Sequence, residues 1–140
     1  MQKEVGNIII GVLALQGGVS EHVSHIEALG YKAILVKNPL DLSLIDGLII
    51  PGGESTTISK LLKLTNIDDQ ILNKAKDGLP IWGTCAGMIL LSKEIENDET
   101  RHLPLLDIRV KRNAYGRQID SFVTEHFINC IDSSKKFPMV

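Results

Sequence analysis

The chain has 140 residues, with 15 Lys and Arg against 17 Asp and Glu, so its formal net charge is −2. A content of 44% hydrophobic and 23% charged residues excludes a disordered or collagen-like chain. The slightly acidic balance argues against a nucleic-acid-binding protein, and no apolar run approaches the ~18 residues of a membrane span. We therefore predict a single soluble domain over residues 1–140, with no nucleic-acid or membrane partner.

The two cysteines, Cys85 and Cys130, are too few for a disulfide framework, and the polar residues 1–6 do not resemble an export signal. We therefore expect reduced thiols and a cytoplasmic location. The four histidines and two cysteines lack the paired spacing that binds zinc, so the sequence predicts no metal site. No cofactor is expected either.

The N-terminal third of the chain begins an alternation of strands and helices. Residues 7–15 form a run that is apolar on both faces, which is typical of a central parallel strand. A helix is predicted from Ser20, as its N-cap, to a stop at Gly30. A second strand over 32–36 ends at the Asn-Pro pair 38–39, because proline removes a hydrogen-bond donor.

The same alternation continues through the middle of the chain. The predicted segments are a strand (47–50), two helices (55–64 and 68–75, closed by Gly78), a strand (79–82) and the apolar start of a helix (88–91). Alternating strands and helices with short connections predict an α/β fold with a parallel sheet and helices on both of its faces.

After residue 93 the character of the sequence changes. A polar loop is expected over 94–101; then come two half-buried strands (105–111 and 119–131), a turn (133–136) and a strand beginning at 137. Cys130 is expected to be a small core residue of the second strand. The sequence stops without the helix that normally covers an open sheet of this kind, so we predict a domain that is incomplete at its C-terminus.

The strongest chemical signal is the segment Gly83-Thr84-Cys85-Ala86-Gly87, between a strand and a helix. This G-x-nucleophile-x-G pattern places one side chain on a strained corner, with glycines where larger residues would clash. It predicts Cys85 as an exposed nucleophile at the carboxyl end of the sheet, where the helix N-terminus favours a thiolate. The alternative is a buried structural cysteine flanked by packing glycines. Trp82, beside this turn, is expected to pack in the core.

A second glycine-rich turn, Pro51-Gly52-Gly53-Glu54-Ser55-Thr56-Thr57, also follows a strand. Its backbone N–H groups are suited to hold a developing oxyanion, together with the N–H of the residue after the nucleophile. The alternative is a tight turn with Ser55 as the N-cap of the next helix. A phosphate-binding loop is disfavoured, because the spacing that ends in Gly-Lys-Ser/Thr is absent.

Four motifs occur in this order: Leu13-Ala14-Leu15-Gln16-Gly17, the turn 51–57, the turn 83–87 followed by Met88, and Arg112-Asn113-Ala114-Tyr115-Gly116-Arg117-Gln118. With them the chain resembles the family of glutaminase subunits of pyridoxal 5′-phosphate synthase, which are class I glutamine amidotransferases. The resemblance covers essentially all 140 residues. It implies a flavodoxin-like or Rossmann-like three-layer sandwich with a mostly parallel central sheet.

The resemblance also implies a function. L-glutamine would be hydrolysed to L-glutamate and ammonia, and the ammonia would pass to a (β/α)8-barrel synthase subunit in a large hetero-oligomer that makes pyridoxal 5′-phosphate (vitamin B6). Cys85 would be the nucleophile that forms a glutamyl thioester. Gly53 and Ala86 would form the oxyanion hole, and Gly52, Gly53 and Glu54 the glutamine-binding loop. Arg112 would bind the glutamine α-carboxylate, which its fork fits bidentately.

One departure from the family matters for the mechanism. The family completes its catalytic triad with a His-Pro-Glu motif, which has no counterpart in this sequence, so we expect residues 1–140 by themselves to turn over glutamine poorly. The histidines present are expected to be surface or packing residues; they are His22, His25, His102 and His126. Two other functions stay open: a glutaminase subunit of another amidotransferase, which motif 112–118 disfavours, and a non-catalytic module that docks on the synthase.

Overall fold

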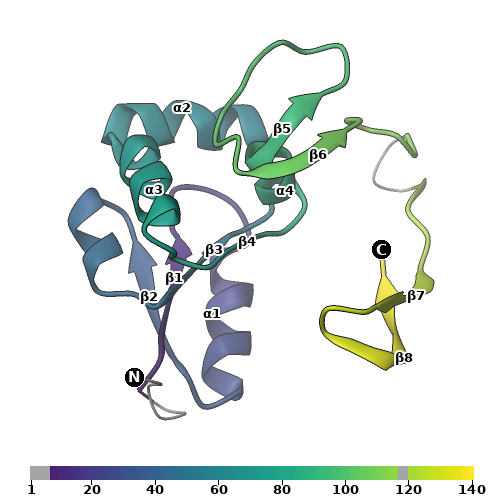
Figure 1. The fold of residues 1–140 in the computed structure, drawn as a ribbon, viewed down its shortest axis with the longest axis horizontal. Coiled ribbons are helices and arrows are strands. Elements are labelled where there is room, and N and C mark those ends of the chain that lie inside the picture. Colours follow the sequence, from purple (N-terminus) through teal and green to yellow (C-terminus); the bar gives the residue numbers. More distant parts are fainter. Residues whose placement is uncertain (1–6, 117–119) are drawn as a thin grey trace. The chain divides into compact units, whose positions relative to one another are not determined.

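The structure is a computed structural model that describes residues 7–116 and 120–140. The chain divides after Val110 into two compact units. The first unit contains an α/β sheet with its helices and a small two-stranded sheet, and the second contains a β-hairpin (Figure 1). Among the described residues, no helix has both the length and the apolar character needed to span a membrane.

The main sheet of the first unit has four parallel strands in the order β2-β1-β3-β4. The strands are β1 (Ile9–Leu13), β2 (Lys32–Val36), β3 (Gly47–Ile50) and β4 (Ile81–Gly83). This is the strand order of flavodoxin-like folds, so the predicted α/β class is confirmed. The order changes direction between β1 and β3, and the loops after these two strands are therefore the expected ligand-binding edge.

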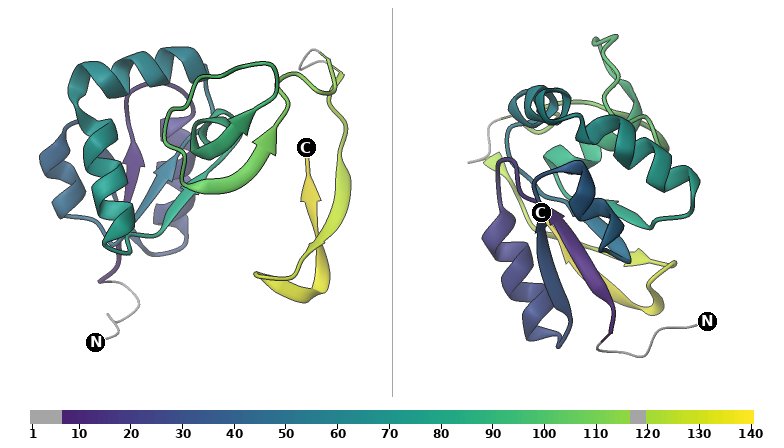
Figure 2. Two further views of the ribbon diagram at one scale, coloured as in Figure 1. Left: turned by 45° about the horizontal axis from the view of Figure 1, so that its top comes forward. Right: turned by 90° about the vertical axis from the view of Figure 1, so that its left-hand side faces the viewer.

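Helices cover both faces of this sheet, as Figure 2 shows. They are α1 (Val19–Ala28), α2 (Ser55–Thr65), α3 (Ile67–Lys76) and α4 (Ala86–Leu91), with the 3-10 helix η1 (Pro39–Ser43). The connection from β1 to β2 runs in the opposite direction to that from β3 to β4. Right-handed crossovers consequently place α1 on one face of the sheet and α3 on the other.

The core of the first unit is aliphatic. Its largest fully buried side chains include Leu13, Leu42, Leu48, Ile50, Ile58, Leu62, Ile67, Ile71, Leu90 and Leu103. They come from the sheet, from η1 and from helices α2, α3 and α4, except Leu103, which lies in the segment after β5. The apolar face predicted for the helix over 55–64 is confirmed in α2, where Ile58 and Leu62 are buried.

Several helices differ from the predictions. α3 and α4 begin one and two residues earlier than expected. α1 begins at Val19 with Gly18 as its N-cap, so Ser20 lies inside the first turn, where its hydroxyl donates to Glu21. The N-cap of α2 is Glu54, so the alternative in which Ser55 caps this helix is wrong. The 3-10 helix η1 was not predicted; Asn38 and Asp41 form a capping box around its first turn.

The predicted helix stops, in contrast, are confirmed. Gly30 follows α1 with φ of 81°, and Gly78 follows α3 with φ of 95°. This left-handed conformation suits glycine, because other side chains are strained there.

The first unit ends in a two-stranded parallel sheet, β5 (Ser92–Ile95) and β6 (Leu106–Val110). The polar loop predicted over 94–101 therefore begins as a strand. The connection between β5 and β6 is anchored on α2, because the ring of His102 hydrogen-bonds to the Ser59 hydroxyl at 2.7 Å. The fully buried Leu103 adds an apolar contact to the core beside it.

The second unit contains the antiparallel hairpin of β7 (Thr124–Ile128) and β8 (Asp132–Met139). The turn predicted over 133–136 is wrong, since these residues belong to β8. The strand predicted over 119–131 begins at a residue outside the described ranges and is shorter than expected. Cys130 lies in the turn between the strands and is exposed, so its prediction as a core residue is wrong. Polar residues occupy β8 because backbone pairing, not burial, holds this hairpin.

Candidate active site at a strand-to-helix turn

Cys85 occupies the corner between β4 and α4. Its backbone has φ of 50° and ψ of −109°, a strained conformation for a residue with a side chain. Two backbone hydrogen bonds hold the corner: the Thr84 N–H donates to the Ile50 carbonyl at 3.0 Å, and the Gly87 N–H donates to the Thr84 carbonyl at 2.9 Å. The turn therefore has the geometry that the G-x-nucleophile-x-G pattern predicts.

The two glycines of this pattern are required by close packing. A Cβ at Gly87 would overlap the carbonyl oxygen of Ile50, and a Cβ at Gly83 would lie 2.5 Å from the carbonyl carbon of Gly87. The Cys85 thiol itself is exposed. The alternative of a buried structural cysteine is thus excluded, although both glycines do serve packing.

The glycine-rich turn after β3 lies directly beside Cys85. A Cβ built at Gly52 would lie 3.2 Å from the Cβ of Cys85 and 4.0 Å from its Sγ. The carbonyl oxygen of Gly52 accepts a hydrogen bond from the Gly18 N–H at 2.9 Å, in the loop after β1. The loops of β1 and β3 and the thiol therefore meet where the strand order changes direction.

Gln16, from the motif over 13–17, holds the same turn in place, a contact that the motif alone does not predict. Its Oε1 accepts a hydrogen bond from the Glu54 N–H at 2.8 Å. A Cβ at Gly53 would lie 2.6 Å from this oxygen and 3.0 Å from the Cα of Gly17. A side chain at position 53 would therefore displace the Gln16 amide that accepts from Glu54, and would press against the loop after β1.

Glu54 serves as the N-cap of α2. Its carboxylate accepts hydrogen bonds from the N–H and hydroxyl groups of Thr56 and Thr57, at distances from 2.6 to 3.2 Å. These bonds, with those from the two hydroxyls as the largest contribution, lower the pKa of Glu54 to about 2. The carboxylate is therefore ionised at neutral pH and fixes the turn to the start of α2.

The predicted site residues fall in both units. Cys85, Ala86, Gly52, Gly53 and Glu54 all belong to the first unit, whereas Arg112 belongs to the second. Ala86 is the first residue of α4, so its N–H has no acceptor within the helix. An N–H of this kind, next to the nucleophile, is one donor that an oxyanion hole needs.

The four histidines have different surroundings. His25 bonds to the Glu21 carbonyl of its own helix, His102 to Ser59, and His126 lies in β7. His22 differs from them, because its Nε2 lies 3.0 Å from the Thr84 hydroxyl, one residue before Cys85. Its position on a helix 62 residues before Thr84 gives no signal of this contact. Within residues 7–116 and 120–140, no hydrogen bond joins a histidine ring to the Cys85 thiol.

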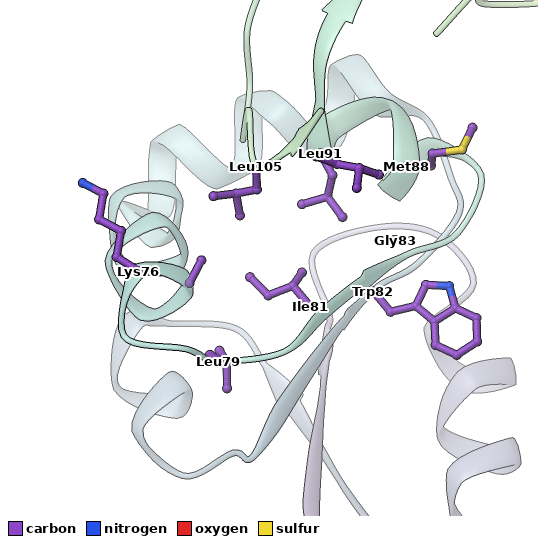
Figure 3. A pocket seen from close by; sticks show the side chains of 10 residues that line it. Lys76, Leu79, Ile81, Trp82, Gly83, Met88, Leu91 and Leu105 are labelled. Atoms are coloured by element: carbon purple, nitrogen blue, oxygen red, sulfur yellow. The ribbon is translucent and has the colours of Figure 1, made fainter. Parts of the chain in front are cut away.

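An open apolar groove of about 560 Å³ is lined by residues of α3, β4, α4 and the start of β6 (Figure 3). The residues that line it are Ala75, Lys76, Leu79, Ile81, Trp82, Gly83, Met88, Leu91, Leu105 and Leu106. Trp82 is 61% exposed, so its prediction as a core residue is wrong. The reason is that β4 is an edge strand of the described sheet, with no strand on its outer side. No cluster of metal-ligating side chains is found in the described parts of the chain.

Comparison with known proteins relates the whole arrangement to one family. The model of the SNO glutamine amidotransferase family matches residues 12–140 and thus spans both units. A pyridoxal 5′-phosphate synthase subunit PdxT from Caldicellulosiruptor saccharolyticus is 62% identical over 119 residues, which are 85% of this chain and 63% of that protein. The subunit of the same name from Clostridium beijerinckii is 54% identical over 126 residues, which are 90% of this chain and 66% of that protein.

Two solved structures have the same fold as this chain. A crystal structure of a glutamine amidotransferase superposes with a TM-score of 0.83 at 40% identity, covering 92% of this chain and 68% of that one. A putative peptidase E protein from Listeria monocytogenes, at 19% identity and a TM-score of 0.61, shares the fold over 76% of this chain and 66% of its own. The chain spans slightly less than two thirds of the length of the two relatives named above. On its motifs, its fold and the family match, the chain belongs to the SNO glutamine amidotransferase family.

Proposed function

We propose that this chain provides the glutaminase centre of a pyridoxal 5′-phosphate synthase, hydrolysing L-glutamine to L-glutamate and ammonia. The observation that carries the proposal is the strained, exposed Cys85 with the Gly52 turn packed against it. Membership of an amidotransferase family and the similarity to PdxT subunits support it. A nucleophile beside a turn with backbone donors is the arrangement that acyl transfer requires.

In the proposed reaction, the Cys85 thiolate attacks the side-chain amide carbon of glutamine. The oxygen of the tetrahedral intermediate takes up negative charge, which the N–H groups of Gly53 and Ala86 stabilise. The carbon–nitrogen bond then breaks, and the leaving nitrogen takes up a proton from solvent, equal in number to the one that the Cys85 thiol lost on becoming a thiolate. Ammonia leaves and a glutamyl thioester remains. Water attacks the thioester, which releases glutamate and regenerates the thiol. No residue among positions 1–140 is assigned to the proton transfers.

Substrate binding is assigned to the turn 52–54 and to Arg112. Gly52 brings the backbone of this turn close to the thiol, and Gly53 packs against the loop after β1. Glu54 acts by fixing this turn, since its carboxylate is bonded to Thr56 and Thr57. Arg112 pairs with the α-carboxylate of glutamine, for which a guanidinium provides two parallel donors.

The ammonia passes to a synthase subunit, for which the family resemblance indicates a (β/α)8 barrel within a large hetero-oligomer. A cytoplasmic location belongs to the same proposal. It is supported by the two unpaired cysteines, one of which must remain a free thiol for the reaction.

The experiment is an assay of ammonia release from glutamine with the synthase subunit present. Activity is expected to disappear in Cys85→Ala and to be retained in the matched control Cys130→Ala, whose thiol is also exposed. Ammonia release that the synthase subunit does not influence would favour a different amidotransferase. Binding to the synthase subunit without ammonia above the Cys85→Ala background would contradict the glutaminase and favour a docking module.

A further inference from the structure

We propose that His22 is a positioning residue for the Cys85 nucleophile, acting through its hydrogen bond to the Thr84 hydroxyl. The bond joins the middle of α1 to the strand-to-helix turn, with 3.0 Å between Nε2 and Oγ1. Both side chains are half-buried, so the bond is partly protected from competing water. This inference rests on the proposed glutaminase function, which makes Cys85 the reacting group.

Thr84 is the residue through which the turn is held. Its N–H donates to Ile50 and its carbonyl accepts from Gly87, so its backbone is bonded on both sides. The bond with His22 adds the side chain as a third attachment. Because Thr84 is fixed in this way, the next residue, Cys85, is kept in its strained conformation with φ of 50°. Loss of one attachment should let this conformation relax.

The same helix also supports the turn beside the thiol. Gly18, the N-cap of α1, donates its N–H to the Gly52 carbonyl, one helical turn before His22. The segment leading into α1 therefore contacts the proposed oxyanion turn, and α1 itself contacts the nucleophile turn. Helix α1, with the residue before it, thus holds the oxyanion turn and the nucleophile turn in a fixed relative position. A preorganised active site needs such a fixed arrangement.

His25 provides a matched comparison on the same helix. It lies three residues further along and is exposed, and its Nδ1 bonds only to the carbonyl of Glu21 within α1. Replacing His25 with leucine therefore changes the helix surface in the same chemical way without touching the nucleophile turn. Replacing His22 with glutamine keeps a polar group that can reach the Thr84 hydroxyl.

The first measurement is amide hydrogen exchange at Thr84 and Gly87, followed for the full chain. In His22→Leu these amides should exchange about fivefold faster, the factor that corresponds to loss of one hydrogen bond. Exchange should return towards the wild-type rate in His22→Gln and be unchanged in His25→Leu. The variant Thr84→Val should resemble His22→Leu, and the double variant should be no worse than either, because one shared bond is lost only once.

The second measurement is the rate at which diazo-oxo-norleucine, a glutamine analogue, labels Cys85 with the synthase subunit present. It should fall about tenfold or more in His22→Leu, since small displacements of a reacting atom are costly, and be largely restored in His22→Gln. Wild-type exchange rates at Thr84 and Gly87 in His22→Leu would overturn the inference, as would a glutamine variant as impaired as the leucine variant. A wild-type chain that is never labelled at Cys85 would instead contradict the proposed function, while the exchange result still decides the role of His22.

Discussion

The N–H of Gly18 donates to the carbonyl oxygen of Gly52 at 2.9 Å, and this bond joins the loops that follow β1 and β3. The two residues are 34 positions apart in the sequence but adjacent in space, because β1 and β3 are neighbouring parallel strands. The bond places the backbone of the 51–57 turn at the edge of the sheet where Cys85 is exposed. Substitutions in either loop should therefore change both the stability of the fold and the reactivity of the Cys85 thiol.

Gly17→Ala should destabilise the fold strongly. Its added Cβ would overlap the Gly52 carbonyl oxygen, and the residue has φ of 104°, so strain and a clash coincide. We expect a loss of about 2–4 kcal/mol in the free energy of unfolding. Gly30→Ala is the control, because it has a positive φ of 81° but nothing within 4 Å of the added Cβ, and should cost about 1 kcal/mol. Urea unfolding gives the free energy of unfolding of both variants. Equal decreases in the two would show that the packing of residue 17 against the Gly52 carbonyl does not contribute to stability.

Gly52→Ala should reduce the reactivity of the Cys85 thiol more than the stability of the fold. The new methyl group would lie 3.2 Å from the Cys85 Cβ, so either the 51–57 turn or the nucleophile turn must move by a few tenths of an ångström. We expect glutaminase activity to fall by about tenfold, less than the roughly 100-fold that a displacement of 1 Å can cost. Gly47→Ala, whose methyl group would have ordinary contacts of 3.6 and 3.7 Å, should retain activity. Full activity of Gly52→Ala would show that this turn is not part of the active site.

Glu54→Gln should alter how stability depends on pH. The folded-state pKa of Glu54 is about 2, below its ordinary value of 4.5, because hydroxyl and N–H groups of Thr56 and Thr57 bond to the carboxylate. A lowered pKa stabilises the fold fully above about pH 4.5, and the contribution is lost as the pH falls towards 2. The melting temperature of wild type should therefore exceed that of Glu54→Gln at neutral pH, with a difference that shrinks in this window. The control is Glu27→Gln, an exposed carboxylate on α1; a similar profile for both variants would contradict the capping role.

Arg112→Lys should weaken glutamine binding while the chain stays folded. Lysine keeps the charge but loses the fork that pairs with a carboxylate through two bonds. We expect KM for glutamine to rise about tenfold with a smaller change in kcat. Arg109→Lys, on β6, is the control, since Arg109 pairs loosely with Glu94 at 4.0 Å. Unaltered kinetics of Arg112→Lys would mean that Arg112 is a surface charge.

The main sheet and its helices could be predicted because their sequences carry strong periodicity. Burial of Ile58 and Leu62 in α2 and of Ile71 in α3 follows the helical spacing of apolar residues. β8 could not be predicted in this way, because its polar residues 133–136 resemble a turn and only the pairing with β7 makes them a strand. The 3-10 helix at Pro39 was missed because proline signals the end of a strand and equally the start of a helix.

Part of the candidate site could also be predicted from the sequence. The pattern around Cys85 predicts the strained corner, because the pattern itself encodes a local backbone geometry. The contacts of Gln16 with Glu54 and of His22 with Thr84 are long-range. Gln16 lies in one of the four motifs, but the motif does not indicate its partner, and nothing in the local sequence distinguishes His22 from other polar residues of α1. Glu54 was not expected as a cap, because N-caps are usually shorter residues. Its longer side chain reaches the same N–H groups and two threonine hydroxyls besides.

The most direct test of the central claim is covalent labelling with diazo-oxo-norleucine, read by mass spectrometry with the synthase subunit present. Both thiols are exposed, so accessibility alone would label Cys85 and Cys130 alike. If Cys85 is the glutaminase nucleophile, the glutamine analogue should add once, at Cys85, and excess glutamine should slow the addition. Cys85→Ser should abolish labelling, and Cys130→Ser should leave it unchanged. Labelling of Cys130 in preference, or equal labelling of both thiols that glutamine does not slow, would contradict the account.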